Sequence, residues 1–438
     1  MKPMIEPIQA VTEWLQQARW AGIQRPYTPA DVLRLRGSLQ IEYTLARVGA
    51  ERLWELLRRE PYVAALSAMT GNQAIEQARA GLKAICASGW QAAAEANTAR
   101  EEYPELNGFP TESVAQLVQN INKSLQRADQ IYHAEGRNDT MWFLPVVADA
   151  ESSAGGSLNS FEMMKTMVES GAAGVNLKDQ IYSANTLGQF QDDVVMSTRS
   201  FQQKLIAARL AADVMGVPTV LIARTDACGA RYIENDSDPQ DHPFLTGERR
   251  ADGCFGFRGG LDAAIARGLA YAPHADLLLC QSSQPDLRAA RRFAEAIHSD
   301  YPGKMLAYNY TPPVNWSQQL DATTIRNFQV ALSGMGYRFQ FVGLAGYQSL
   351  NMGMLELARR YREAGMAAFT RLHEPELERG HGQEGTAVKP ARNLGAGYLD
   401  EVARMIGARP ASRAAMRAPE EEKRSSVEWA TMPGKTAN

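Results

Sequence analysis

The chain has 438 residues, of which 45% are hydrophobic and 22% are charged, and its formal net charge is −3. This composition is that of a globular protein with a large core, and the length suits a single elaborated barrel. Basic residues are scattered and balanced by acids, which argues against a nucleic-acid-binding protein. No run of about 18 apolar residues occurs, so no membrane span is expected. The start, MKPMIEPIQAVTEW, has an early acid and no apolar signal core, which argues against secretion.

Four cysteines lie far apart in the sequence and form no CxxC pair: Cys86, Cys228, Cys254 and Cys280. They predict reduced, mostly buried thiols, and neither a disulfide framework nor a zinc site. Together with the missing signal core, this cysteine usage favours a cytoplasmic protein.

The elements change character along the chain. Residues 1–80 are predicted to be helical, because VTEWLQQARWAGI and NQAIEQARAGLKAI carry apolar residues at helical spacing. From residue 84, short apolar runs alternate with helix-length amphipathic stretches, which is typical of parallel strands buried on both faces. Seven such runs can be counted, and an eighth is not clear: 84–90, 141–151, 172–180, 218–227, 275–283, 304–312 and 338–346.

This alternation predicts an α/β fold, a TIM-like (β/α)8 barrel, over residues 81–365. An open doubly wound sheet is disfavoured because its Gly-rich nucleotide-binding turn is absent. Residues 228–260, rich in Gly, Asp and Arg, form an excursion between the fourth and fifth of the seven runs. Residues 366–408 are assigned to a C-terminal helical segment, and the polar residues 409–438 to a disordered tail.

In such a barrel the active site lies at the carboxyl ends of the strands. Acids, amides and basic residues gather at the predicted ends, more than a solvated surface would supply by chance. The resulting candidates are Ser88, Gly89, Trp90, Asp149, Glu151, Lys178, Asp179, Arg224, Asp226, Gln281, Asn309, Thr311 and Gly343.

Two carboxylates, Asp149 and Glu151, directly follow the apolar run FLPVVA. Oxygen ligands of this kind suit Mg²⁺, which keeps several waters when it binds. The alternative is that these acids, with the serines after them, cap the following helix.

The basic candidates also have structural alternatives. Arg224 could clamp a substrate carboxylate through two parallel hydrogen bonds, or it could pair with Asp226. Lys178 could be a surface lysine beside Asp179. Cys280 has no evident activating base and is expected to be a buried thiol. None of the six histidines is assigned a catalytic role.

Several segments together resemble isocitrate lyases, in order and at similar spacing, to about residue 407. They are SGWQAAAEAN, RADQIY, FLPVVADAE, ARLAADVMGVPTVLIARTDA, TGERR, RGLAYAPHADLL, PDLRAARRFAEAIH, YPGKMLAYN and GYRFQFVGLAG. The resemblance implies a TIM-like barrel with added N-terminal helices, and a homotetramer that exchanges C-terminal helices between subunits. It also implies Mg²⁺-dependent retro-aldol cleavage of a 2-hydroxy acid, with Mn²⁺ as a substitute metal.

The half of the site that would bind the metal and glyoxylate is largely kept. Ser88, Gly89 and Trp90 match the family's SGW element, and Arg224 matches the arginine that clamps glyoxylate. The resemblance implies a metal site with Asp149 and Glu151, and with Glu105 where the family usually has aspartate.

The other half departs from the family. The KKCGHMGGK segment aligns without a gap to residues 185–193, NTLGQFQDD, which puts Leu187 at the catalytic cysteine and keeps Gly188. HFEDQ reads NLKDQ, with Lys178 at a glutamate. The succinate-binding NCSPSFNW reads NYTPPVNW, which keeps Asn309 but has Thr311 and Pro313 at the serines. Gly343 and Gln281 replace a threonine and a glutamate.

Leucine cannot donate a proton, so the known acid step has no agent at residue 187. Each lost hydroxyl donor removes a hydrogen bond to a carboxylate, worth about 1.5–3 kcal/mol. Lys178 would also repel a nearby Mg²⁺ by roughly 6–7 kcal/mol at 5 Å and an effective dielectric of 20. Three outcomes are open: the lysine swings out, stays neutral as a base, or displaces the metal.

These departures lead to three hypotheses. The first is a Mg²⁺-dependent carbon–carbon lyase, an oxo-acid lyase, that acts on a small 2-hydroxy or 2-oxo carboxylic acid other than isocitrate. Its substrate would contact Ser88, Gly89, Trp90, Gly188, Asn309 and Thr311, and its catalytic residues would be Lys178, Tyr182 and Arg224. The alternative is an inactive paralogue that assembles with a related lyase as a hetero-oligomer. The third is an authentic isocitrate lyase.

Overall fold

The computed structural model describes residues 8–102, 110, 112–150, 155–181, 194–310, 315–371, 374 and 396–408. Clustering of contacts divides the chain into two units. One comprises residues 1–126 and 139–354, and the other comprises residues 127–138 and 355–438. No helix among the described residues is long and apolar enough to cross a membrane.

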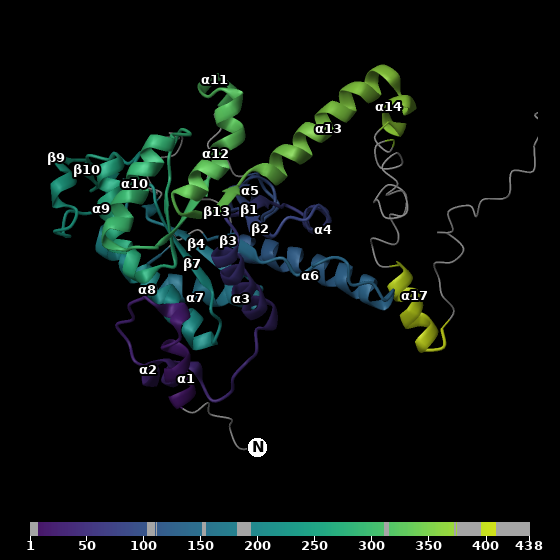
Figure 1. Ribbon diagram of the computed structural model, residues 1–438, viewed down its shortest axis with the longest axis horizontal. Helices are drawn as coiled ribbons and strands as arrows, with labels where there is room; N and C mark the ends of the chain where they lie inside the picture. Colours follow the sequence, from purple (N-terminus) through teal and green to yellow (C-terminus); the bar gives the residue numbers. More distant parts are fainter. Residues whose placement is uncertain are drawn as a thin grey trace, which may run out of the picture. The chain divides into compact units, whose positions relative to one another are not determined.

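Eight parallel strands of the first unit close into a barrel in the order β1-β13-β12-β11-β7-β4-β3-β2. The predicted TIM-like barrel is therefore confirmed. Helices from α7 to α12 surround its strands (Figure 1). The strands are β1 (Val63–Ser67), β2 (Ala84–Ala87), β3 (Val146–Asp149), β4 (Gly174–Lys178), β7 (Val220–Thr225), β11 (Leu277–Cys280), β12 (Met305–Asn309) and β13 (Tyr337–Val342).

The seven strands expected from apolar runs are all present, and the eighth is β1. This strand reads VAALS and lies within residues 1–80, which the sequence pattern assigned to helices. It pairs with β13 and β2, and so closes the barrel before residue 81. Its alanines carry little strand signal, because only its single valine is β-branched.

Helices precede, separate and follow the strands. Those before the barrel are α1 (Ile8–Leu15), α2 (Pro29–Arg36) and α3 (Thr44–Arg59). Those between the strands are α4 (Gly71–Arg79), α5 (Gly89–Ala94), α6 (Ser113–Ala134), α7 (Ser157–Glu169), α8 (Thr198–Met215), α9 (Leu261–Tyr271), α10 (Leu287–Asp300), α11 (Trp316–Gln319) and α12 (Ala322–Gly334). After β13 come α13 (Ala345–Ala364), α14 (Met366–Thr370) and α17 (Ala396–Met405).

Local signals explain where the helices begin and end, as α8 illustrates. Its N-cap Ser197 accepts a hydrogen bond from the Ser200 amide, and its C-cap Gly216 adopts the left-handed conformation with φ of 69°. Serine at the N-cap and glycine in that conformation at the C-terminus are the preferred residues at these positions.

A second, five-stranded sheet includes parts of the predicted excursion. Its strands follow the order β5-β6-β8-β10-β9. They are β5 (Gln180–Ile181), β6 (Val194–Val195), β8 (Tyr232–Ile233), β9 (Leu245–Arg249) and β10 (Phe255–Phe257). Three of them, β8, β9 and β10, lie within residues 228–260.

The barrel core is an apolar cluster that also includes side chains of α3. Leu53 and Leu57 of this helix belong to the same buried cluster as Val63, Val220 and Leu277, at or near the amino ends of their strands. The helix therefore closes the amino end of the barrel and leaves the carboxyl end for polar residues.

In the second unit, the described residues are helical. The Arg127 guanidinium lies 4.7 Å from the centre of the Tyr398 ring. The tail assigned to residues 409–438 lies outside the described residues, as does most of the segment between α14 and α17.

Candidate functional site

Strand alternation determines which side chains face the inside of the barrel. Val147, Ile222 and Ala307 belong to the central apolar cluster, so residues two further along each strand point the same way. Several polar residues therefore lie together at the carboxyl ends of neighbouring strands, and we call this group of residues the rim cluster. Its members are Asp149, Asn176, Lys178, Arg224 and Asn309, with Ser88 and Gln281 directly after their strands.

Asp149 lies at the end of β3 and is partly buried. Its Oδ1 accepts a hydrogen bond of 2.9 Å from Nδ2 of Asn176, its register partner on β4. Among the described residues, the buried Oδ1 of Asn176 has no hydrogen-bond partner. A carboxylate and an orphaned amide oxygen are thus adjacent at the rim, and both are ligand types that hard cations prefer.

Asn176 was not a candidate in the sequence, because it lies inside an apolar strand. The signal that could have found it is its spacing of two from Lys178, which puts both side chains on one face of β4.

Two basic side chains are neighbours at the rim. Lys178 is 1% exposed and is the register partner of Arg224 on β7. Lys178 is therefore not a surface lysine. Two basic side chains next to each other at one end of a barrel can each donate hydrogen bonds to a carboxylate of a substrate.

Arg224 also forms the ion pair with Asp226 that was the structural alternative for this residue. Its Nε donates to Asp226 Oδ2 at 2.8 Å, and its Nη2 donates to Asp226 Oδ1 at 2.6 Å. Such a bidentate pair fixes the plane of the guanidinium. Asp226 therefore orients the arginine and is part of the candidate site.

Asp179 lies on the opposite face of β4, outside the barrel. Its carboxylate accepts hydrogen bonds from the Thr225 hydroxyl, the Tyr271 hydroxyl and Arg267, and from the Asp226 amide at 2.9 Å. Burial raises the pKa of Asp179, and Arg267 opposes this rise. This network holds the backbone of Asp226 and, through it, the orientation of Arg224. Arg267 could not have been found from the sequence, since it lies in the middle of α9.

The SGW element forms the start of α5. Ser88 is the N-cap and is 3% exposed, Gly89 is buried, and Trp90 is 45% exposed. Across the barrel, Asn309 Nδ2 donates to Gln281 Oε1 at 3.1 Å, which links the ends of β12 and β11. Gly343 directly follows β13.

Five predicted site residues lie outside the described residues: Glu105, Glu151, Tyr182, Gly188 and Thr311. The structure brings together Ser88, Asp149, Lys178, Arg224 and Asn309. Among the described residues, no group of three or more histidine, cysteine or acidic side chains could hold a metal ion.

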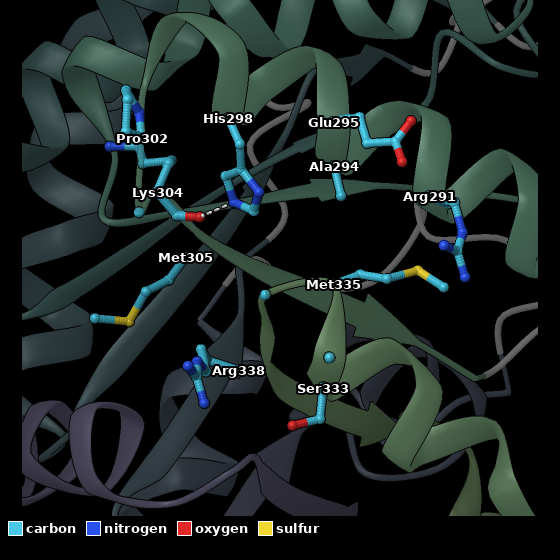
Figure 2. Close-up of a pocket in the computed structure, with 13 residues that line it drawn as sticks. Arg291, Ala294, Glu295, His298, Pro302, Lys304, Met305, Ser333, Met335 and Arg338 are labelled. Atoms are coloured by element: carbon cyan, nitrogen blue, oxygen red, sulfur yellow. Dashed lines mark hydrogen bonds between the residues drawn. The ribbon is translucent and has the colours of Figure 1, made fainter.

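A cavity of about 540 Å³ lies away from the rim cluster, beside the amino ends of β12 and β13. Its lining includes Arg291, His298, Lys304 and Arg338, and the His298 ring makes a hydrogen bond to the Lys304 carbonyl (Figure 2). Because barrel active sites lie at the carboxyl ends, this cavity is not the candidate active site.

Solved structures show which known proteins share this fold. An oxaloacetate acetylhydrolase in complex with 3,3-difluorooxalacetate aligns with a TM-score of 0.56 and 17% identity, over 83% of this chain and 98% of that chain. A 2,3-dimethylmalate lyase, described as a member of the PEP mutase/isocitrate lyase superfamily, aligns with a TM-score of 0.55 and 17% identity, over 82% of this chain and 95% of that one. This chain has the barrel fold of these proteins.

Sequence comparisons then give the family. The isocitrate lyase family profile matches residues 7–252 and 248–424. The chain is 50% identical to the isocitrate lyase of Halalkalibacterium halodurans over 412 residues, 93% of this chain and 96% of that protein. It is 47% identical to the Escherichia coli enzyme over 417 residues, again 93% and 96% of the two chains. The chain belongs to the isocitrate lyase family.

These comparisons correct the leading functional hypothesis. A lyase for an acid other than isocitrate was expected because residues of the predicted succinate half differ from the family. However, near-complete coverage at about half identity to proteins named isocitrate lyase favours an authentic isocitrate lyase. The weakness of the hypothesis is that it relied on substitutions at a few positions of the predicted site, whereas the identity extends over 93% of the chain.

Proposed function

We propose that this protein is an isocitrate lyase, which cleaves isocitrate to glyoxylate and succinate. The main observation that supports this proposal is the 50% identity to an isocitrate lyase over 93% of this chain and 96% of the relative. In this reaction the 2-hydroxyl group loses its proton, the bond between C2 and C3 breaks, and the carbanion of succinate gains a proton.

The basic side chains at the rim fit a substrate that has more than one carboxylate. Isocitrate carries three carboxylates, and Lys178 and Arg224 are neighbouring cations on β4 and β7. Arg224 binds the carboxylate of the glyoxylate half, and Lys178 compensates a second carboxylate. Ser88, Gly89 and Trp90 contact the glyoxylate half from the start of α5, and Asn309 contacts the succinate half, with Thr311 and Gly188.

The oxygen groups at the rim fit a divalent cation. Asp149 offers a carboxylate, and the unpartnered Oδ1 of Asn176 lies beside it. We assign Mg²⁺ to this place, with Glu151 and Glu105 as the further carboxylates, and with Mn²⁺ as a substitute. A cation held there would supply Lewis-acid stabilisation of the negative charge that develops at the 2-hydroxyl oxygen.

The proton for the succinate carbanion comes from a group other than a thiol at residue 187, which is leucine. Lys178 is our candidate, with Tyr182 as the second. Lys178 is almost fully buried, and its ammonium group both carries a proton and reduces the charge of the developing carbanion.

The experiment is a steady-state assay of the purified protein with isocitrate and Mg²⁺, in which glyoxylate is trapped as its phenylhydrazone and succinate is measured independently. We expect equal amounts of both products. Lys178→Arg keeps the charge but removes an effective proton donor, so kcat should fall by roughly 10²–10⁴-fold while KM changes little. Absence of glyoxylate from the wild-type protein would refute the proposed function. A fully active Lys178→Arg enzyme would refute only the role of Lys178.

A further inference from the structure

Two cysteines that are distant in the sequence meet at the outer wall of the barrel. Cys228 follows β7, and Cys280 is the last residue of β11. Their Sγ atoms are 3.3 Å apart, although 52 residues separate them along the chain. The sequence predicted reduced, mostly buried thiols. The order of strands in the predicted barrel makes β7 and β11 neighbours, but it does not show which side chains of the two segments meet.

The pair lies outside the barrel lumen. Leu277 and Leu279 of β11 belong to the central apolar cluster, so Cys280 points to the opposite face of the strand. There, both cysteines pack against a second apolar cluster that includes Ala263 and Ala264 of α9. Cys228 and Cys280 are residues of intermediate exposure, whereas Cys86 is buried.

Backbone hydrogen bonds fix the turn that carries Cys228. The Gly229 amide donates to the Asp226 carbonyl at 3.1 Å, and the Gly260 amide donates to the Ala227 carbonyl at 3.0 Å. On the other side, Cys280 is held by the barrel, as the register partner of Thr225. The fold therefore holds the two sulfur atoms close together.

The two thiols differ in acidity. The hydrogen bond from Cys280 lowers the pKa of Cys228. The same hydrogen bond, together with burial, raises the pKa of Cys280 well above its ordinary value. Because the thiolate is the nucleophile in thiol–disulfide exchange, Cys228 reacts first and Cys280 second.

We propose that Cys228 and Cys280 form a redox-active pair that a small disulfide, such as oxidised glutathione, converts into an intramolecular disulfide. The Cys228 thiolate attacks one sulfur of the small disulfide, forms a mixed disulfide and releases one thiolate. Cys280 loses its proton to solvent, attacks the Cys228 sulfur and releases the second thiolate. Two protein thiols are thereby oxidised to one disulfide, and one small disulfide is reduced to two thiols.

The bond would act on the candidate active site, and this part of the inference rests on the proposed function. A disulfide requires a sulfur–sulfur distance of about 2.05 Å, so the two chain segments must approach by roughly 1 Å. Asp226, which orients Arg224, lies two residues before Cys228. Gln281, which accepts a hydrogen bond from Asn309, directly follows Cys280. Oxidation therefore shifts groups on both sides of the rim.

Peptide mapping tests the disulfide without reference to activity. The reduced protein is equilibrated in buffers of increasing ratio of oxidised to reduced glutathione, quenched with acid, alkylated, digested without reductant and analysed by mass spectrometry. We expect a linked peptide that contains Cys228 and Cys280, formed equally in the control Cys254→Ser. In Cys280→Ser, a glutathione adduct should persist on Cys228. Wild-type protein that keeps both thiols free, or that accumulates the adduct without the link, would overturn the proposal.

Activity tests the consequence. Wild-type and Cys254→Ser enzymes should lose roughly tenfold or more of kcat/KM for isocitrate on oxidation and recover it with dithiothreitol. Cys228→Ser should not respond. A linked peptide with unchanged turnover would overturn the effect on the site. Absence of turnover in the reduced protein would refute the proposed function, while the mapping result would stand by itself.

Discussion

Asp226 and Arg224 form a bidentate ion pair at the end of β7, with donor–acceptor distances of 2.8 and 2.6 Å. The Asp226 amide in turn donates to Asp179, whose carboxylate is bound by Arg267 at 3.0 Å. The guanidinium that faces the barrel is therefore oriented by a chain of charged groups that ends outside the barrel.

We predict that Asp226→Asn weakens substrate binding more than turnover. Asparagine can accept only one of the two hydrogen bonds from Arg224, and its amide group faces a guanidinium N–H. The loss of one charged hydrogen bond, about 1.5–3 kcal/mol, corresponds to an increase in KM of roughly 10–100-fold. Steady-state kinetics with isocitrate measures this, and Asp262→Asn, in an exposed pair with Arg292, is the matched control. An unchanged KM would show that Arg224 does not need Asp226.

The metal assignment predicts that oxalate binds only in the presence of Mg²⁺, because oxalate imitates a 2-oxo acid held at a metal. Asp149→Ala should abolish this binding, since it removes the carboxylate beside the orphaned Asn176 oxygen. Asn176→Ala should weaken binding less, because it removes a neutral ligand and leaves the charge. Isothermal titration calorimetry with and without Mg²⁺ measures all three proteins. Equal binding in the absence of metal would contradict the assignment.

The elements of the fold that could be predicted are those with a clear pattern of apolar residues in the local sequence. Seven strands lie in apolar runs that alternate with helix-length amphipathic stretches, and each was found. β1 was missed because VAALS is rich in alanine and follows three helices, so it resembles the helical stretch around it. Its identity as a strand depends on β13, which lies far along the chain and supplies the pairing partner.

The residues of the candidate site also divide into those that could be predicted from the sequence and those that could not. Asp149, Lys178 and Arg224 could be predicted because they end strands, where a barrel collects its side chains. Arg267 could not, since it acts from the middle of a helix outside the barrel, and the contact between the sulfur atoms of Cys228 and Cys280 could not either. Asn176 could have been found from its spacing of two from Lys178. The substrate prediction was wrong because it relied on substitutions in short motifs, whereas half of the residues along nearly the whole chain match an isocitrate lyase.

A third prediction concerns the stability of the amino end of the barrel. Asp276 is 5% exposed, and its carboxylate contacts Arg19 at 2.7 Å and Arg209 at 2.6 Å. Asp276→Asn removes the carboxylate that pairs with both buried guanidinium groups, so the free energy of unfolding should fall by about 3–5 kcal/mol. Thermal and urea unfolding measure the change. Asp262→Asn, which breaks an exposed ion pair, should unfold like the wild type.

The Asp276 carboxylate also predicts that the stability of the protein decreases at acid pH. Burial acts to raise the pKa of Asp276, but attraction to Arg19 and Arg209 outweighs it and holds the pKa below the ordinary value of 3.8. A depressed pKa contributes stability above pH 3.8, and this contribution is lost as the pH falls below that value. The Asp276→Asn protein should therefore show a weaker decline in melting temperature in this acid range than the wild type. Parallel declines would contradict the assignment.

The last prediction concerns alkaline pH and Lys304. Its Nζ donates to the Ala275 carbonyl at 2.6 Å, and burial lowers its pKa from 10.5 to about 8. Between these two pH values the unfolded chain binds more protons at this residue than the folded chain does, so the free energy of unfolding rises with pH. Lys304→Met removes the titrating group, and its melting temperature should rise less steeply from pH 8 to 10.5 than that of the wild type. Lys83→Met, which removes an ammonium that is 48% exposed, should keep the wild-type slope. Identical slopes for wild type and Lys304→Met would show that Lys304 stays protonated across this range.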